Sequence, residues 1–249
     1  MSKKVICLDA GHGGSDPGAV ANGLKESVVA FEVVNFLKKR LERAGVEVVL
    51  SRPNAENNPG INERWQFANG SRADYFLSIH VNAGGGTGAE TFFYRASTDR
   101  SRRSEAFSRA VNDNYAHKMG LRNRGVKPDT QTHIGAIGVL RHTQMPAALI
   151  ELAFIDSPPD NPDVFILQNR RIEIAEALAT GILCYFKIDE EPAQLPDIPA
   201  APKVTLDILG NVTEISGYIE NGATWVRLTE FSRELGFLAS WEGQTYPCN

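Results

Sequence analysis

Two histidines and two glutamates have the side-chain types of a catalytic metal site, although they are spread over more than half of the 249-residue chain. His12 lies in the segment DAGHGG, and His80 lies in FLSIHVNA. Glu26 precedes a long amphipathic stretch, and Glu151 lies in the apolar segment ALIEL. Two neutral imidazoles and one carboxylate, with a fourth position left to water, form a recognised catalytic zinc site, and a second carboxylate can carry protons during hydrolysis. The four residues therefore favour a metal-dependent hydrolase.

Each of these residues also has a purely structural explanation. His12 could be a loop residue among glycines, and His80 could be a hydrogen-bonded histidine of the core. Glu26 could complement the dipole of the helix that follows it. Glu151 is the hardest to explain in this way, because a lone carboxylate in an apolar strand is costly unless it is paired or bound to a metal.

Strands that alternate with helices over the first 186 residues would bring these side chains together. We expect buried strands at 5–8, 75–81 and 146–154, and an amphipathic helix at 27–44. The alternation predicts an α/β fold with a mostly parallel, twisted sheet flanked by helices. Because the carboxyl ends of parallel strands share one edge of a sheet, the four residues could converge there. Further strands are expected at 46–50 and 90–94, and further helices at 61–71, 101–117 and 162–186, the last with a break near 169.

The composition excludes several broad classes of protein. Twenty-six basic against thirty acidic residues give a formal net charge of -4, which argues against a dedicated nucleic-acid binder. No apolar run approaches the ~20 residues that cross a bilayer, so membrane insertion is not expected. The N-terminus reaches Asp9 and His12 before a signal-peptide core can form, which predicts synthesis in the cytoplasm. The cysteines contain no CxxC pair, and Cys7 and Cys184 are expected to be small buried hydrophobic residues without a disulfide.

The composition changes after residues 1–187, which are expected to form the catalytic domain. Residues 188–203 contain four prolines and are expected to form an extended linker. Residues 204–249 are expected to form a small α+β module, with two strands that turn at 220–222 and a helix at 229–235. A unit of this size is near the lower limit for independent folding, so pairing with a second copy is one way to complete its core.

Several motifs occur in the order in which they occur in a known enzyme family. They are LDAGHGGSDPGA, GLKE, RADYFLSIHVNA, RGVKP and VLRHTQMPAALIELAFID. On these motifs, residues 1–186 resemble the zinc-dependent N-acetylmuramoyl-L-alanine amidases of the amidase-3 family. The resemblance implies His12, Glu26 and His80 as ligands of Zn²⁺ and Glu151 as the catalytic carboxylate. It also implies cleavage of the amide between N-acetylmuramic acid and L-alanine of the stem peptide, so the expected partner is peptidoglycan and the expected place of action is the bacterial cell wall.

The chain departs from the usual family pattern in two places. SIHVNA stands where SIHANA is more usual, and ELAFID stands where E-x-GF-x-S/TN is more usual; both keep the functional residue. The C-terminal stretch TWVRLTEFSRELGFLASWEG resembles the small repeat related to the N-terminal domain of copper amine oxidases. No copper chemistry is expected, because residues 204–249 contain no histidine. This module is expected either to bind the cell wall or to form a dimer, and a monomer is the alternative.

Three further side chains are candidates for contact with the substrate. Asn82 lies two residues after His80 and could orient the substrate or fix the loop. Arg124 and Lys127 could meet carboxylates of the stem peptide, or they could form a solvated charged surface. Arg64 is expected to be a structural ion-pair or cap residue.

Two other functions stay open at this point. One is a non-catalytic peptidoglycan-binding protein, against which Glu151 argues, because a binding module does not need a buried base. The other is a zinc carboxypeptidase or another amide hydrolase. The biological setting is open as well: a phage endolysin released through a holin pore or by lysis, a bacterial autolysin and a spore-lysis enzyme all fit.

Overall fold

The computed structural model describes residues 3–132, 135–188, 203–208, 211–220 and 223–226. The chain divides into two compact units, Met1–Asp189 and Glu190–Asn249, and each is described by itself. Within the described residues, no helix is long and apolar enough to cross a membrane.

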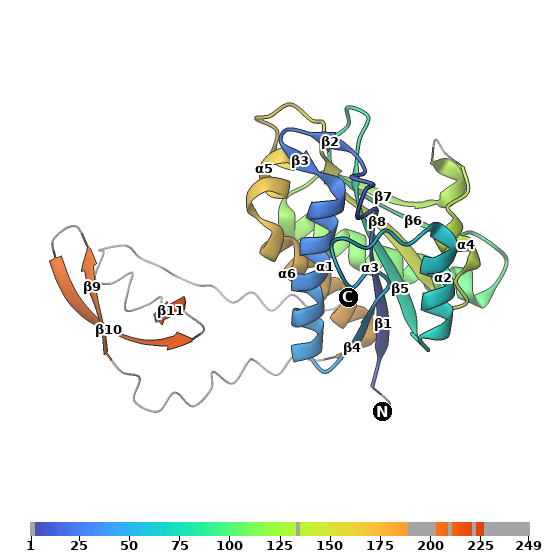
Figure 1. Ribbon diagram of the computed structural model, residues 1–249. Coiled ribbons are helices and arrows are strands. Elements are labelled where there is room, and N and C mark those ends of the chain that lie inside the picture. Colours follow the sequence, from blue (N-terminus) through green and yellow to red (C-terminus); the bar gives the residue numbers. More distant parts are fainter. Residues whose placement is uncertain (1–2, 133–134, 189–202, 209–210, 221–222, 227–249) are drawn as a thin grey trace. The chain divides into compact units, whose positions relative to one another are not determined.

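The first unit is built around a six-stranded sheet with the order β4-β1-β5-β8-β6-β7 (Figure 1). The four strands from β4 to β8 are parallel, β6 runs antiparallel to β8, and β7 runs parallel to β6. The predicted α/β fold with a mostly parallel sheet is therefore confirmed. The strands are β1 (Val5–Ala10), β4 (Glu47–Leu50), β5 (Tyr75–Asn82), β6 (Ala89–Phe93), β7 (Asn123–Pro128) and β8 (Ala147–Phe154), and a separate hairpin is formed by β2 (Val20–Ala21) and β3 (Leu24–Lys25).

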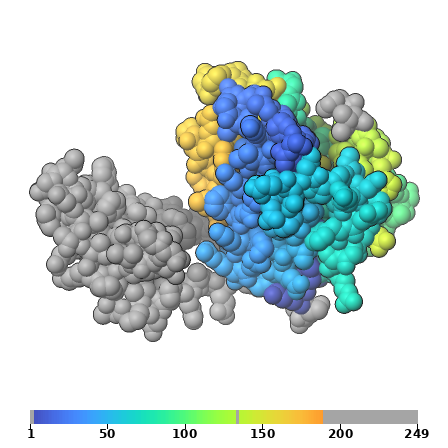
Figure 2. Space-filling model, viewed as in Figure 1, coloured from blue at the N-terminus to red at the C-terminus, as the bar shows by residue number. Residues whose placement is uncertain are grey.

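Helices cover both faces of this sheet. One face packs against α1, α3 and α6 through the larger apolar core, and the other face packs against α2 and α4 through a smaller core. In the view of Figure 2, α1 and α2 lie toward the reader in blue and cyan. The helices are α1 (Glu26–Arg43), α2 (Ile61–Gly70), α3 (Asp99–Met119), the short 3₁₀ helix Asp129–Gln131, α4 (Gly138–His142), α5 (Pro162–Asn169) and α6 (Arg171–Phe186).

The helix ends follow from local chemistry that the sequence displays. The hydroxyl of Thr98 accepts a hydrogen bond from the backbone of Ser101 and caps α3, which ends at Gly120 in the left-handed conformation with φ 66°. Asn161 caps α5, and Pro162 occupies its first turn. The predicted break near residue 169 is confirmed, because α5 ends there and α6 starts two residues later.

Three features of the structure were not expected. Strand β7 was missed because its sequence NRGVKP is polar and contains a glycine and a proline, which are rare in strands. The short helix α4 and the β2–β3 hairpin were also missed. Cys7 is a buried free thiol as expected, but Cys184 is only half-buried, so its assignment as a fully buried residue is wrong.

The described part of the second unit is an antiparallel sheet with the order β11-β10-β9. Its strands are β9 (Lys203–Ile208), β10 (Asn211–Glu220) and β11 (Ala223–Val226). Strands β10 and β11 pair as predicted on either side of residues 221–222, and β9 is an additional strand. The predicted helix at 229–235 and nearly all of the predicted linker lie outside the described residues, so the linker and the module as separate domains stay predictions.

Candidate metal centre

The loop after β1 carries His12 on a backbone that two buried arginines hold in place. His12 adopts the left-handed conformation with φ 57°, which is uncommon for a residue with a side chain. The guanidinium of Arg64 donates to the carbonyl oxygens of Ala10 and His12, both at 2.7 Å. Arg52, which is 1% exposed, donates to the carbonyls of Ala10 and Gly11. The loop is therefore fixed through its backbone, independently of any ligand of the histidine.

Arg64 is itself anchored by a buried carboxylate at the end of β1. Its Nη1 lies 2.7 Å from Asp9 Oδ1, and both side chains are buried. Ser78 donates to Asp9 Oδ2 at 2.6 Å, and Ser51 donates to Oδ1. Burial alone would raise the pKa of Asp9, but Arg64 and the two hydroxyls hold it below its ordinary value. The expectation that Arg64 is a structural ion-pair residue is confirmed.

Three of the predicted residues meet in one place, which we call the His–Glu–His cluster: His12, Glu26 and His80. One ligand atom from each of them lies within 4.8 Å of the other two. Glu26 is the first residue of α1, and its Oε1 lies 2.8 Å from His80 Nδ1 and 3.2 Å from His12 Nε2. Two backbone amides, those of Ala19 and Val81, donate to the carboxylate oxygens of Glu26 and fix their direction.

Glycines leave the space in which the cluster forms. A Cβ on Gly11 would lie 2.4 Å from the ring of His80, and a Cβ on Gly18 would lie 2.6 Å from a carboxylate oxygen of Glu26. Both distances are far below van der Waals contact. The glycines of the DAGHGGSDPGA motif at these two positions are therefore required by the close approach of the cluster side chains.

In the metal-free cluster, the two histidines bind protons at ring nitrogens that could otherwise bind a metal cation. The hydrogen bond with Glu26 raises the pKa of His12 to about 9. Burial opposes a charge on His80, yet the hydrogen bond with Glu26 raises the pKa of His80 above its ordinary value. Burial acts to raise the pKa of Glu26, but the two histidines hold it far below its ordinary value. An anion that draws protons onto two imidazoles offers the same charge and the same atoms to a divalent cation, and a set of two imidazoles and one carboxylate fits Zn²⁺.

Glu151 lies on β8 directly opposite His80 on β5. The side chains of residues paired in this way point to the same face of a sheet. Glu151 Oε2 is enclosed and has no hydrogen-bond partner among the described residues. Burial raises the pKa of Glu151 to about 7. A carboxylate with an unsatisfied oxygen and a pKa near neutrality is suited to take up and release a proton.

Glu90 is a functional candidate that the sequence reasoning missed. It lies on β6 opposite Glu151, and its side chain is 6% exposed. Asn82 donates to Glu90 Oε1 at 2.7 Å, Lys127 donates to Oε2, and Arg124 Nε lies 3.1 Å from Oε2. These four residues form the Glu90 cluster, and it contains all three side chains that were predicted to contact the substrate. The only sequence signal for Glu90 was its place two residues before Phe92 in a predicted strand.

Comparison with known proteins identifies the family. The sequence profile of the family Amidase_3, described as N-acetylmuramoyl-L-alanine amidase, matches residues 6–184. The chain belongs to the N-acetylmuramoyl-L-alanine amidase family. The match spans all of the six-stranded sheet except Val5, together with the His–Glu–His cluster, Glu151 and the Glu90 cluster.

Individual amidases and a phage enzyme are similar to this family member. The N-acetylmuramoyl-L-alanine amidase CwlM of Bacillus licheniformis is 34% identical over 86% of this chain and 82% of its own. The endolysin of Bacillus phage SPP1 is 32% identical over 89% of this chain and 82% of its own. The sporulation-specific amidase of Bacillus subtilis is 38% identical over 62% of this chain, which spans 58% of that protein. The crystal structure of the N-acetylmuramoyl-L-alanine amidase from Clostridium difficile 630 has a TM-score of 0.66 at 27% identity, covering 76% of this chain and 99% of the other.

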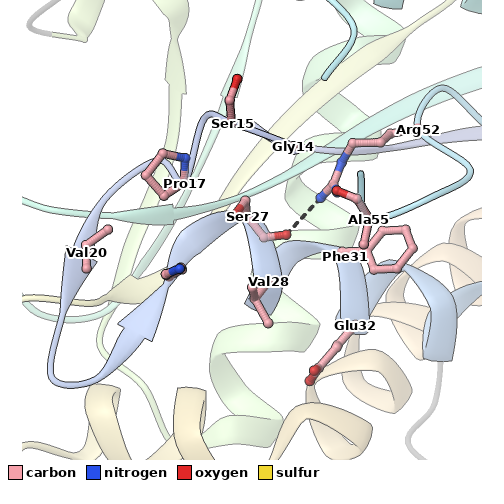
Figure 3. A pocket seen from close by; sticks show the side chains of 11 residues that line it. Gly14, Ser15, Pro17, Val20, Ser27, Val28, Phe31, Glu32, Arg52 and Ala55 are labelled. Atoms are coloured by element: carbon pink, nitrogen blue, oxygen red, sulfur yellow. Dashed lines mark hydrogen bonds between the residues drawn. The ribbon is translucent and has the colours of Figure 1, made fainter. Parts of the chain in front are cut away.

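A cavity of about 590 Å³ lies beside the His12 loop of this amidase-family chain and does not include the His–Glu–His cluster (Figure 3). Gly14, Ser15 and Pro17 of the loop line one part of it, and Val28 and Phe31 of α1 line another. Arg52 also lines the cavity, and its hydrogen bond to the carbonyl of Ser27 is drawn in the figure. None of the four predicted chemical residues lines it, so it is separate from the candidate metal centre.

Proposed function

We propose that the chain is a zinc-dependent peptidoglycan hydrolase that cleaves the amide between N-acetylmuramic acid and the L-alanine of the stem peptide. The chain is a family amidase, and the proposal adds the metal and the residues. The observation that supports it most directly is that ligand atoms of His12, Glu26 and His80 lie within 4.8 Å of one another. Glu151 is paired with His80 on the neighbouring strand. These four side chains come from three strands or strand ends and one helix start, so their meeting is a property of the fold and not of one local motif.

The three cluster residues would hold Zn²⁺, and Glu151 would move the proton. Bound zinc would supply a Lewis acid for the scissile carbonyl and a water of lowered pKa. Glu151, with its pKa near 7, accepts the proton of the attacking water and passes it to the nitrogen of the leaving L-alanine. The buried amide hydrogen bonds to Glu26 and the backbone bonds to the His12 loop keep the site from rearranging as the charge moves.

The proposal extends to the place of action and to the accessory parts of the chain. Similar proteins include a phage endolysin and bacterial amidases, so action at the bacterial cell wall is proposed for either origin. Asn82, Arg124 and Lys127 are proposed to contact substrate, and residues 204–249 are proposed to bind the wall or to form a dimer. A non-catalytic binding protein is disfavoured, because such a protein has no use for the unsatisfied oxygen of Glu151.

Metal content and product mass, measured together on purified cell wall, test the proposal. We expect one zinc ion per chain and release of stem peptides that begin with L-alanine. Glu151→Gln should keep the zinc and lose about 10²- to 10⁴-fold in turnover, the usual contribution of general acid–base catalysis. His12→Ala should lose the metal. A Glu151→Gln protein with nearly full turnover, or a carboxypeptidase product that lacks only a C-terminal residue, would contradict the proposal.

A further inference from the structure

A row of charged side chains runs across four neighbouring strands of the sheet. His80 on β5 is paired in register with Glu151 on β8, and Glu151 is paired with Glu90 on β6. Lys127 on β7 is paired with Phe92, two residues after Glu90 on β6. Residues that are paired on neighbouring strands point to the same face of a sheet, and so do residues two positions apart on one strand. The row therefore leads from the candidate metal centre to the edge strand β7 on one face.

The far end of this row carries an excess of positive charge. Glu90 is 6% exposed, whereas the side chains of Arg124 and Lys127 are 26% and 29% exposed. Lys127 and Arg124 lower the pKa of Glu90 against the effect of burial, so this residue is ionised at neutral pH. One buried anion thus neutralises one of two cations. The outer surfaces of both cations stay accessible, and the Glu90 cluster keeps a net charge of +1.

Arg124 has donor capacity that its neighbours do not use. Its Nε is enclosed and lies 3.1 Å from Glu90 Oε2, but it is not aligned for a hydrogen bond. Its Nη1 reaches the carbonyl of Thr87 only at 3.4 Å. The guanidinium lies over the ring of Phe154 at 4.9 Å, which holds its plane without using an N–H group. A guanidinium fixed in this way can still bind a planar anion.

We propose that Arg124 and Lys127, oriented by Glu90, form a subsite for a carboxylate on the peptide part of the substrate. The inference rests on the proposed amidase function, since it places that carboxylate relative to the bond that Glu151 helps to break. Within this assignment Arg124 and Lys127 are specificity-determining residues, and Glu90 is a positioning residue.

The spacing of the strands favours the second residue of the peptide as the bearer of the carboxylate. Both cation heads meet Glu90, and neighbouring strands lie about 4.8 Å apart, so the heads lie roughly one strand spacing from the strand of Glu151. An extended chain advances about 3.3–3.6 Å per residue. The carboxyl of the first residue is consumed in the next peptide bond, so the second residue is the first position along the peptide that can carry a free carboxylate, either at the end of the chain or on its side chain.

The chemistry of the substrate places the peptide on the β7 side of Glu151. The lactyl carboxyl group of the sugar is consumed in the scissile amide, so the sugar next to this bond brings no carboxylate. Free carboxylates occur on the peptide. A cationic subsite on the β7 side therefore binds the leaving peptide, and the sugar extends in the other direction.

A pair of substrates that differ in one group tests this proposal. The probes are two muramoyl-L-alanyl dipeptides that are identical except that the second residue carries either a carboxylate or a carboxamide. We expect the wild-type protein to prefer the carboxylate in KM. Lys127→Met and Arg124→Gln should each raise KM for the carboxylate probe by about tenfold or more, the effect of one charged hydrogen bond, with little change for the carboxamide probe. Lys127→Arg should retain the preference.

Arg122→Gln is the matched control, because Arg122 is exposed and precedes the same strand. This control should leave both KM values unchanged. A second readout does not need turnover: calorimetric titration with the free L-alanyl dipeptides should show the same preference in Kd. Equal losses on both probes in Lys127→Met and Arg124→Gln would assign these residues a structural role and overturn the subsite. A wild-type protein that binds the carboxylate peptide selectively but cleaves neither probe would refute the proposed function and leave the subsite standing.

Discussion

The charged row has the candidate metal centre with its His12 loop at one end, which we call the His12 end, and strand β7 at the other, which we call the β7 end. The two ends are held in different ways. At the His12 end, Arg64 and Arg52 are buried and donate to backbone carbonyls of the loop. The path of the loop is therefore fixed without contacts to the loop's own side chains. At the β7 end, Arg124 and Lys127 are part-exposed and meet a single buried carboxylate through their side chains. The first arrangement holds the loop rigidly, as a metal site requires, while the second allows the cations to adjust to a ligand.

This difference in burial predicts that one end of the row affects the stability of the fold and the other affects binding of the substrate. Removal of a buried cation leaves a buried anion without its partner, which is costly to the fold. Removal of one of the two part-exposed cations at the β7 end costs the fold less, because the other cation still pairs with the buried carboxylate of Glu90. Substitutions at the His12 end should therefore change stability and metal binding together, and substitutions at the β7 end should change substrate affinity.

The largest effect is expected from Arg64→Met, which tests the first half of this comparison. The substitution leaves Asp9 buried with only two hydroxyl partners, frees the carbonyl of His12 and leaves the carbonyl of Ala10 with only the hydrogen bond from Arg52. We expect a loss of about 3 kcal/mol in the free energy of unfolding, or roughly 6–12 °C in Tm, measured by denaturation of the metal-free protein.

Arg102→Met is the matched control for this experiment. Arg102 is 74% exposed and pairs with Asp99 within one turn of α3, so its loss should change stability by less than about 0.5 kcal/mol. If Arg64→Met were as stable as Arg102→Met, the claim that buried arginines fix the His12 loop would be wrong.

A smaller effect, on the order of tenfold per pH unit, is expected in the pH dependence of zinc affinity. The pKa of His12 is raised to about 9 in the metal-free protein, and its imidazole must be neutral to bind a metal. Between pH 7 and 9, zinc affinity should therefore rise by about tenfold per unit for the His12 proton alone. Chelator competition at several pH values measures this slope. A flat profile would show that no proton leaves the cluster when zinc binds.

The same shift has the opposite sign for the stability of the metal-free protein. Because the folded-state pKa of His12 lies above the ordinary value of about 6.5, its contribution is fully present below pH 6.5 and is lost as pH rises through 9. Glu90 behaves differently, because its lowered pKa keeps it ionised over this whole range. The preference for a carboxylate substrate should thus stay constant from pH 7 to 9 while zinc affinity changes, which separates the two ends of the row in one titration.

Apolar patterning made most of the fold predictable. The strand segments VICLDA and AALIELAF are nearly continuous apolar runs, and the stripe along α1 is fully buried, so each could be assigned from its own sequence. Strand β7 could not be assigned in this way, because its polar side chains are matched by Glu90, which lies more than 30 residues earlier in the chain. Its position in the sheet depends on a long-range ion pair, which periodicity does not reveal.

The same contrast holds for the site: its residues could be predicted from the sequence around them, but the contacts between residues far apart in the chain could not. His12, Glu26, His80 and Glu151 could be named from their residue types beside expected strands and helices, and the resemblance of the surrounding motifs to a family implied the role of each. The contacts that orient them could not be named, since Arg52 and Arg64 act on backbone carbonyls that any sequence would supply. Arg124 and Lys127 were named as candidates for substrate contact, but that they share one buried anion follows only from the β6–β7 register.

The smallest effect is expected from Asp16→Asn, which asks how far side chains support a loop already fixed through its backbone. Asp16 Oδ2 lies 2.8 Å from His12 Nδ1, on the side of the ring opposite to Glu26, but the Asp16 side chain is 48% exposed. An asparagine keeps an acceptor for Nδ1 and loses the charge. We expect zinc affinity to fall by about threefold to tenfold, at or below the lower limit for buried partners of metal-bound histidines, because water screens the lost charge.

This measurement belongs at pH 9 or slightly above, where about half or more of the His12 imidazoles are neutral and competition from their proton is small. At lower pH the loss of Asp16 also lowers the pKa of His12 and so favours metal binding, which partly cancels the loss. Asp99→Asn, at a more exposed acid on α3, should leave zinc affinity unchanged. A hundredfold loss in Asp16→Asn would mean that this side chain orients His12 as strongly as the buried arginines do, and the distinction between a backbone-held and a side-chain-held end of the row would fail.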